Sequence, residues 1–585
     1  MKEGYFHLVY YQGSTMQGKI IIWTLLDLVL YTSLLQINAS AELGIGTNKI
    51  YEGKPGQAYK GLVLENGLKV ILVSDPNTTS EAASLHVAVG SMNEPRELQG
   101  LAHLLEHVIL LRGSTKYPEL QGFGKYLHLH GGFRDATTRP DNTEYYFSLN
   151  PNALEGALDR LFNMVHSPIL SESSITAEID LVSSENTKYM PRDDSRLGRI
   201  NMHTSRVGHP FNTFTTGSRD TLWNKPRELG LDVRNETEQF YKKFYSANLM
   251  TLAVIGKDNL TILEEIVTRI FTPLKNRNAT LSKWEQPPFG PSELGVKIEM
   301  VAMGEMKRLI MLFPIPDQDK DVFKNYIAPV MTQGGNHSLF SFLKLEGFAT
   351  LSSALVDEKF RGCFSLEVTH DLTDLGVLRH EEVVVQFFQF VNLLRNYPPQ
   401  KWFWDEAEEV RNYTRKYKTD VEAYVVASSL GKSMIENSPD EVISEYLNPK
   451  RIPFNSTQII NSLEWIRPEN MRLYLVSNSI KNASRTEPHY QVKYNFEPFD
   501  SEFLMAMKTN KSHPNITFPS SNVFIPKDFT IKQNISEDIY KYTNFSSIWI
   551  YANNETNSPK IEVTIGLYSN AIEGRISQKN CFYCP

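Results

Sequence analysis

The stretch LAHLLEHVILL, residues 101–111, places three ionisable side chains in an otherwise apolar run. Its leucine, isoleucine, valine and alanine residues surround the helical wheel, so the run predicts a largely buried α-helix. On that helix His103 and His107 project from the same side one turn apart, and Glu106 lies beside them. Burying two imidazoles and a carboxylate without partners is costly, so the helix requires a further group from elsewhere in the chain.

The spacing H-x-x-E-H is typical of a metal site. Two neutral imidazoles four residues apart can hold a divalent cation, and zinc is the usual ion for nitrogen ligands. A neighbouring carboxylate that does not bind the ion can accept a proton from the attacking water. The order of the three residues is that of inverzincins, the reverse of H-E-x-x-H. On these residues alone, a chance pattern or a buried histidine pair without metal stays an open alternative.

A second segment, SSITAEIDLVSSENTKY, offers the missing group. Glu178 and Glu185 stand seven residues apart in it, a spacing that returns nearly to the same face of a helix. Both carboxylates are therefore expected to point in one direction, and they are the candidates for a third ligand. The alternative is a solvated acidic face, which is the usual environment of glutamates on helices.

Length and charge limit the class of protein. The 585 residues are enough for about three or four domains. The composition, 41% hydrophobic and 22% charged, is ordinary for a soluble globular protein. The formal net charge is -7, whereas nucleic-acid-binding proteins are usually basic, so nucleic acid is not an expected partner.

The N-terminal segment predicts secretion. From Met16 the sequence has a basic start, an apolar run and a small-residue A-x-A site that ends at Ala41. We therefore expect a signal peptide within residues 1–41, with Met16 as the start and the preceding fifteen residues superfluous. Asp27 and the modest length of the apolar run count against a stable membrane span.

Sequons and cysteines agree with an extracellular protein. N-x-[ST] sequons are dense along the chain, for example at Asn77, Asn259 and Asn515, and predict a glycoprotein. The chain has 3 cysteines, so we expect a large core rather than disulfides to stabilise it. Cys581 and Cys584 form a single C-x-x-C, which without a second pair does not indicate a metal site.

Alternating strand and helix patterns predict an α+β fold. Residues 61–75 predict two strands around an Asn-Gly turn, and the pattern of strands and helices restarts at about residue 228 in a second unit of similar build. A third unit begins near Trp402. Residues 484–544 are rich in proline, asparagine, lysine and serine, and predict a linker.

Together these segments resemble the M16 family of zinc metallopeptidases, in its insulysin, pitrilysin and nardilysin branch. The matching stretches include GLVLENGLKVILVSDP, GLAHLLEHVILL, NTEYYFSL, SENTKY, GHPFNTFTTGSRDTL and RPENMRLYLVS. The likeness covers roughly residues 55–570 and is to the N-terminal half of these proteins. It implies repeated α/β sandwich units that form a truncated half of a clamshell, and peptides bound by strand addition to a sheet edge.

The resemblance also implies a role for each candidate residue. His103, His107 and Glu185 would bind one zinc ion. Glu106 would be the general base, and Glu178 would orient the site from outside the metal's own ligands. The implied activity is that of a zinc metalloendopeptidase acting on peptides or small unfolded proteins.

The resemblance suggests a division of the chain. We expect a signal peptide at 1–41, the catalytic zinc domain at 42–228, a second α+β domain at 229–400, a partial middle domain with linker at 401–570, and an unrelated tail at 571–585.

Two departures from the family pattern affect the expected function. Asp135 replaces an asparagine that helps hold substrate, and a carboxylate near the zinc is expected to shift the pH optimum or weaken binding of anionic groups. The second half of the family's chain is missing. We therefore expect the peptidase activity of this chain to depend on a second M16 half or on a homo-oligomer. The alternative function is a catalytically weak or inactive half that acts as a peptide-binding or regulatory partner.

Overall fold

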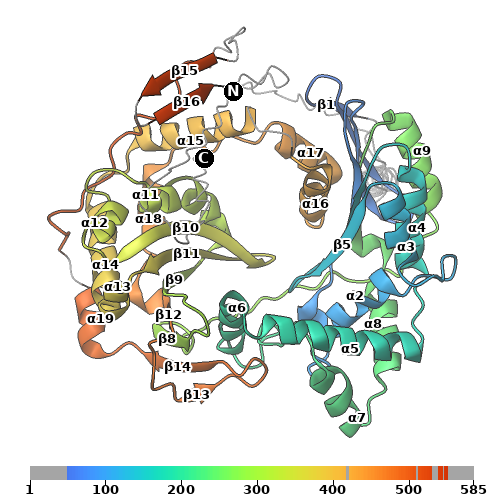
Figure 1. The fold of residues 1–585 in the computed structure, drawn as a ribbon, viewed down its shortest axis with the longest axis horizontal. Helices are drawn as coiled ribbons and strands as arrows, with labels where there is room; N and C mark the ends of the chain where they lie inside the picture. The colour runs from blue at the N-terminus through green and yellow to red at the C-terminus, as the bar shows by residue number, and fades with distance from the viewer. Residues whose placement is uncertain (1–48, 417–420, 509–510, 530–537, 544–545, 551–585) are drawn as a thin grey trace, which may run out of the picture. The chain divides into compact units, whose positions relative to one another are not determined.

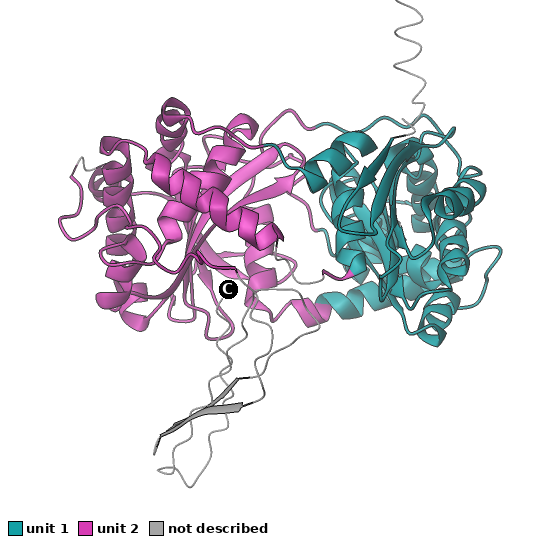
Figure 2. Cartoon of the chain, turned by 90° about the horizontal axis from the view of Figure 1, so that it is seen from above, with its two compact units in different colours: residues 1–186, 215–283, 423–450 teal, residues 187–214, 284–422, 451–585 magenta. Residues whose placement is uncertain are grey.

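The computed structural model describes residues 49–416, 421–508, 511–529, 538–543 and 546–550. It contains two compact units, coloured separately in Figure 2. Unit 1 comprises residues 1–186, 215–283 and 423–450, and unit 2 comprises residues 187–214, 284–422 and 451–585. The two units interleave along the chain. The contiguous domain boundaries expected from the sequence stay predictions. The signal peptide and the tail lie outside the described residues.

Unit 1 is built on a seven-stranded mixed sheet, with strand order β1-β2-β3-β7-β4-β6-β5 (Figure 1). Its strands are β1 (Ile50–Glu52), β2 (Ala58–Val63), β3 (Lys69–Ser74), β4 (Glu81–Val87), β5 (Phe133–Thr138), β6 (Thr143–Leu149) and β7 (Met250–Gly256). Strands β3 and β7 pair in parallel, and the other neighbours pair antiparallel. The predicted hairpin over residues 61–75 is confirmed as β2 and β3.

Helices cover both faces of this sheet, since alternate side chains of a buried strand point to opposite faces. On β3, Val70 and Leu72 belong to the core under one helical layer, and Ile71 and Val73 to the core under the other. The first layer contains α2 (Leu101–Leu111), α3 (Gly122–Leu129), α4 (Leu154–His166), α5 (Glu172–Tyr189), α8 (Val233–Phe244) and α9 (Leu260–Phe271). The second layer contains α16 (Ala423–Ser433) and α17 (Pro439–Leu447).

The second layer comes from a distant part of the chain, and a lysine of the sheet holds its first helix. Leu430 and Met434 of this segment share a core with Ile71 of β3. Lys69 Nζ donates hydrogen bonds to the carbonyl oxygens of Met434 and Asn437, at 2.9 and 3.1 Å, where α16 ends. A cation at the C-terminus of a helix stabilises its last, otherwise unpaired carbonyls.

Unit 2 contains a second seven-stranded mixed sheet, with order β10-β11-β9-β12-β8-β14-β13. Its strands are β8 (Val296–Val301), β9 (Arg308–Ile315), β10 (Ala349–Phe360), β11 (Cys363–Leu372), β12 (Arg472–Ser477), β13 (Arg485–Thr486) and β14 (Lys493–Pro498). Its helices include α6 (Asp193–His203), α11 (Ala328–Thr332), α12 (Leu339–Leu345), α14 (His380–Asn396), α15 (Lys401–Lys416), α18 (Ser456–Leu463) and α19 (Ser501–Met507).

The two sheets repeat one topology. The order β5-β6-β4-β7-β3-β2-β1 in unit 1 corresponds strand for strand to β10-β11-β9-β12-β8-β14-β13 in unit 2. The single parallel pair, β3 with β7 and β8 with β12, falls at the same place in each sheet. The predicted α+β class with repeated sheet units is therefore confirmed.

The linker expected over residues 484–544 is wrong at β13, β14 and α19, and again at the strand Asp538–Thr543. In unit 1 the outer hairpin, β1 and β2, precedes the rest of the sheet along the chain, whereas in unit 2 the equivalent hairpin, β13 and β14, follows it. These strands lie at the edge of the sheet, and most of their side chains are exposed or half-buried. The composition of such strands is polar, so it resembles that of a linker.

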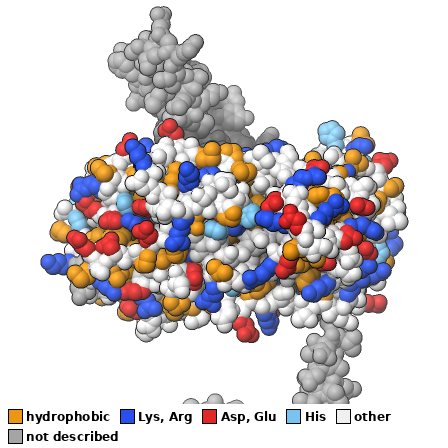
Figure 3. Space-filling view, turned by 90° about the horizontal axis from the view of Figure 1, so that it is seen from below, with side chains coloured by type: hydrophobic (Ala, Val, Ile, Leu, Met, Phe, Trp, Pro, Cys, Tyr) orange, Lys and Arg blue, Asp and Glu red, His pale blue; other side chains and the backbone are white. Residues whose placement is uncertain are grey.

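The last described strands, β15 (Asp538–Thr543) and β16 (Ser546–Ile550), form a separate antiparallel pair. Residues 538–550 thus add a hairpin after the linker region. Within the described ranges, every helix is too short or too polar to cross a membrane. On the face drawn in Figure 3, acidic and basic side chains are interspersed.

Candidate metal centre

The start of helix α2 is fixed by close backbone packing. Gly100, which precedes the helix, has a φ of 94°, a left-handed conformation that glycine adopts without strain. A Cβ atom at Gly100 would lie 2.3 Å from Cα of Gly217, so the position also has no room for a side chain. This approach of two glycines brings the neighbouring Thr216 alongside the first turn of α2.

A half-buried glutamate caps α2 in place of the side chain that Gly100 lacks. The oxygens of Glu94 accept hydrogen bonds from the backbone N–H groups of Gly100 and Ala102, each at 2.8 Å. Burial raises the pKa of Glu94 to about 8, although these N–H groups oppose the shift. Sequence reasoning missed Glu94. The available signal was a helix preceded by glycine, which needs a cap from elsewhere.

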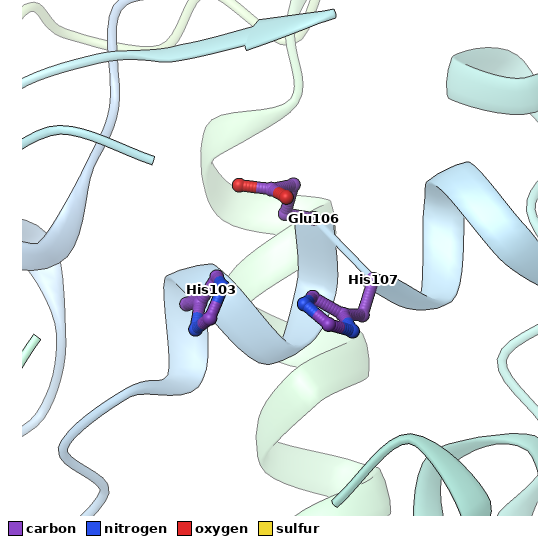
Figure 4. Close-up of side chains that lie close together, drawn as sticks. All are labelled: His103, Glu106 and His107. Carbon is purple, nitrogen blue, oxygen red and sulfur yellow. The ribbon is translucent and has the colours of Figure 1, made fainter. Parts of the chain in front are cut away.

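Hydrogen bonds at Nδ1 orient the two histidines of α2. Nδ1 of His103 lies 2.7 Å from the carbonyl oxygen of Thr216 and donates to it. Nδ1 of His107 lies 3.3 Å from Oε2 of Glu178. The imidazole centroids are 4.7 Å apart, and both rings project from the same stretch of helix (Figure 4). With Nδ1 engaged in this way, Nε2 of each ring is the ligand atom left for a metal.

Glu185 faces both Nε2 atoms from helix α5. Its Oε2 lies 3.1 Å from Nε2 of His107 and 3.6 Å from Nε2 of His103. The side chains are accessible to solvent: 15% of His103, 16% of His107 and 29% of Glu185 is exposed. The predicted helix over 173–189 is confirmed as α5, and it brings both of its glutamates to α2, as their spacing required.

Two acidic side chains are near enough to complete a metal site. The ligand atoms of His103, Glu106 and His107 lie within 4.8 Å of one another, so these three residues form one group able to hold an ion. Glu106, however, is only 4% exposed, and its Oε2 accepts a hydrogen bond of 2.6 Å from the hydroxyl of Thr138. Glu185 is more open and contacts both Nε2 atoms, which favours it as the third ligand.

Glu106 has the environment of a proton acceptor. Burial raises the pKa of its carboxyl group, while His103 and the hydroxyl of Thr138 act in the opposite direction. A raised pKa brings a carboxylate nearer to neutral pH, where a general base works best. Thr138, which belongs to strand β5, was not identified from the sequence because its contact with α2 spans 32 residues.

Glu178 connects α5 to α2, the helix that carries His103 and His107. The side chain is fully buried, and its Oε1 accepts a hydrogen bond from Nε of Arg112, the residue that ends α2. Its other oxygen lies beside Nδ1 of His107. A residue with these contacts can orient the imidazole of His107 without binding the metal itself. This is the role that the sequence resemblance implied. The roles of all five candidate residues stay predictions.

The effect that the sequence predicts for Asp135 on the metal centre stays a prediction, and the structure describes the surroundings of this residue. Asp135 pairs with Tyr146 across the two strands, and its Oδ2 lies 3.4 Å from the tyrosine hydroxyl. Thr138, which contacts Glu106, is three residues further along β5. Because side chains of a strand alternate, an odd separation places the two residues on opposite faces of the sheet.

We expect metal binding to release a proton. Burial lowers the pKa of His107, but Glu178 and Glu185 raise it more, to about 9. At pH 7 the metal-free imidazole is therefore protonated, and a metal ligand must be neutral. Calorimetric titration with Zn²⁺ in buffers of different ionisation enthalpy should show about one proton released, and affinity rising roughly tenfold per pH unit from pH 6 to 8. Zinc binding by the wild type without proton release would contradict this account.

The cap at Glu94 predicts a specific pH dependence of stability. Its pKa in the folded protein, about 8, lies above that of an unfolded glutamate, so the folded state binds more protons between these values. The contribution of Glu94 to the free energy of unfolding therefore falls as pH rises from about 4.5 to 8. Hydrogen exchange of α2, measured at pH 5 and pH 8, should show this fall in the wild type and a smaller one in Glu94→Gln. Equal pH dependence in both proteins would contradict the assignment.

Three family models match successive parts of the chain. "Insulinase (Peptidase family M16)" matches residues 69–211, "Peptidase M16 inactive domain" matches residues 232–410, and "Middle or third domain of peptidase_M16" matches residues 416–583. The first of these ranges contains all five candidate site residues.

Among proteins with similar sequences, the insulin-degrading enzyme of Drosophila melanogaster is 32% identical over 525 residues, which are 88% of this chain and 52% of that protein. The A-factor-processing enzyme of Saccharomyces cerevisiae is 32% identical over 480 residues, 81% of this chain and 46% of that protein. The chain thus spans about half the length of the curated relatives it matches.

Solved structures agree with this assignment. The crystal structure of pitrilysin matches 86% of this chain and 54% of its own, with a TM-score of 0.77 and 26% sequence identity. A protease from Helicobacter pylori shares the fold over 73% of this chain, with a TM-score of 0.58 and 16% identity. The three successive family matches, the insulin-degrading enzyme relatives and the pitrilysin fold together show that this chain belongs to peptidase family M16, in its insulysin-like branch.

Proposed function

We propose that this chain is a zinc metalloendopeptidase that hydrolyses peptides or small unfolded proteins. The observation that carries the proposal is the meeting of His103, His107 and Glu185 beside the buried carboxyl group of Glu106. Membership of peptidase family M16 supports the same activity.

The donor set fits zinc. Two imidazole nitrogens and one carboxylate oxygen are a ligand set found in catalytic zinc sites, which keep a further position open for water or substrate. The partners at Nδ1, Thr216 for His103 and Glu178 for His107, are the kind that fix the tautomer of zinc-binding histidines. Zinc, when bound, supplies a positive charge that polarises a peptide carbonyl and lowers the pKa of a water molecule.

Glu106 carries the proton in the proposed reaction. It accepts a proton from the attacking water and returns it to the amine that leaves when the peptide bond breaks. The hydrogen bond from Thr138 holds one carboxylate oxygen, and helix packing excludes solvent from the side chain, so the group is positioned before substrate arrives.

Strand β5 is the proposed docking edge for the peptide. It is the last strand in the sheet of unit 1, so within the described residues its outer edge has no neighbouring strand. Its final residue, Thr138, contacts Glu106 directly. A peptide that adds to this edge by main-chain hydrogen bonds therefore passes the metal centre.

We also propose a second M16 half or a homo-oligomer as a partner in full activity. The N-terminal pattern and the density of sequons support export through the secretory pathway, with glycosylation. The second candidate function is a peptide-binding or regulatory half that holds zinc and binds peptides with little or no turnover.

We expect the variant Glu106→Gln to lose peptide hydrolysis and keep its metal, because the amide cannot accept the proton but leaves the three ligands unchanged. Turnover of a quenched fluorescent peptide of about ten residues should fall at least about a hundredfold. Zinc content, measured by mass spectrometry, should stay near one ion per chain. The matched control is Glu97→Gln, which alters an exposed glutamate just before α2 and should retain activity.

The same experiment separates the two candidate functions. Turnover that a chelator stops, and that the Glu106→Gln variant lacks, supports the peptidase. A wild-type chain that holds one zinc ion and binds the peptide without cleaving it supports the regulatory half. Equal turnover in the wild type and in Glu106→Gln would contradict the assigned role of Glu106.

A further inference from the structure

Strand β5 presents opposite charges on its two faces at consecutive positions. Arg134 lies on the face that carries Thr138, since the two residues are four positions apart. Asp135 lies on the other face, where it is paired with Tyr146. Neither charge is needed for the zinc chemistry proposed above, and both lie on the strand that forms the open edge of the sheet.

Arg134 forms no ion pair within the described ranges, and Asp135 is the acidic side chain that opposes the effect of burial on its pKa. Its guanidinium packs on α3, where a Cβ atom at Gly124 would lie 3.2 Å from both Nε and Nη2. The Nε atom is shielded from solvent and has no hydrogen-bond partner among the described residues. Partial burial of an unpaired cation costs free energy, and burial accordingly lowers the pKa of this group. A carboxylate placed next to it would recover this cost through charge-assisted hydrogen bonds.

Asp135 lies beside an aromatic surface and, in the part of the chain that is described, no Lys or Arg side chain reaches ion-pair distance of its carboxylate. Its oxygens contact the backbone N–H of Ala136 and the hydroxyl of Tyr146. Tyr146 is stacked on Tyr424 of α16 with centroids 5.4 Å apart, and Phe133 packs edge-on against Tyr424 at 5.2 Å. A carboxylate next to aromatic rings is an environment that attracts a cationic side chain.

We propose that β5 selects peptides by the charge of two consecutive residues, an acidic one beside Arg134 and a basic one beside Asp135. The inference rests on the proposed function, in which a peptide adds to this edge. Side chains directly opposite each other in paired strands lie on the same face, and neighbouring residues of the added strand lie on opposite faces. One acidic–basic dipeptide therefore meets both charges at once.

The position of this dipeptide relative to the cleaved bond also follows from the strand. Arg134 and Thr138 are separated by four residues, or about 13 Å of extended chain. Because Thr138 contacts Glu106, we place the charged pair about four residues from the peptide bond that is cleaved. The structure thereby assigns the selected substrates to peptides with adjacent charges of opposite sign at that distance.

The test measures binding separately from hydrolysis. The full chain carrying Glu106→Gln, loaded with zinc, is titrated into fluorescein-labelled twelve-residue peptides, and binding is followed by anisotropy. A neutral peptide is the reference, and single aspartate or lysine substitutions are moved along it one position at a time. We expect one position where aspartate strengthens binding about five- to tenfold, and an adjacent position where lysine does the same.

Two variants, each combined with Glu106→Gln, assign the preferences to their residues. Arg134→Ser should remove the preference for aspartate and keep that for lysine, whereas Asp135→Asn should do the reverse. Arg134→Glu should change the first preference to lysine. Lys125→Ser, which removes an exposed charge from α3, is the matched control and should keep both preferences.

The outcomes distinguish this inference from the function on which it rests. Binding of the neutral peptide with no charge preference at any position, or with preferences that Arg134→Ser and Asp135→Asn leave unchanged, would overturn the inference alone. Failure of every peptide to bind, including the neutral one, would overturn the proposed peptide docking as well.

Discussion

The ion-paired carboxylate of Glu178 determines how the two helices of the metal centre pack. It is fully buried, accepts a hydrogen bond from Arg112 and lies 3.3 Å from Nδ1 of His107. An unpaired buried charge costs several kcal/mol, so α2 and α5 are stable together only in the register that joins these groups. Seven residues further along α5, the same register places Glu185 against both Nε2 atoms. The arrangement of the site therefore depends on a fully buried residue behind His107.

The repeated sheet explains where the site lies. Both units have the same order of seven strands with one parallel pair at the same place, yet within the described residues the H-x-x-E-H helix belongs to unit 1. The fold thus supplies an edge strand twice, β5 and β10, and the chemistry comes from side chains added to one copy. In unit 1 the helices of the metal centre cover one sheet face, while α16 brings Tyr424 to the other. Residues on alternate positions of β5 consequently meet two chemically different surfaces.

Local patterns predicted the helices α2 and α5 and the five candidate side chains, because metal-ligand spacing and helical periodicity extend over only a few residues. The residues that support them were missed: Glu94 caps α2 without any local motif, and Thr138 and Thr216 contact it through folding of distant segments. The family resemblance singled out Asp135 without saying which face of the sheet it occupies, and the alternation of β5 places it on the face opposite Thr138. Likewise, the polar composition of β13 and β14 concealed their place at the edge of the second sheet.

The central claim is that one metal ion is held by His103, His107 and Glu185, with Glu106 outside its ligands. Anomalous diffraction at the zinc absorption edge, from crystals of the zinc-loaded chain, tests it directly. The account predicts a single peak at about 2.0–2.2 Å from Nε2 of both histidines and from a carboxylate oxygen of Glu185. A peak coordinated by Glu106 in place of Glu185, or no peak at this cluster, would contradict the account.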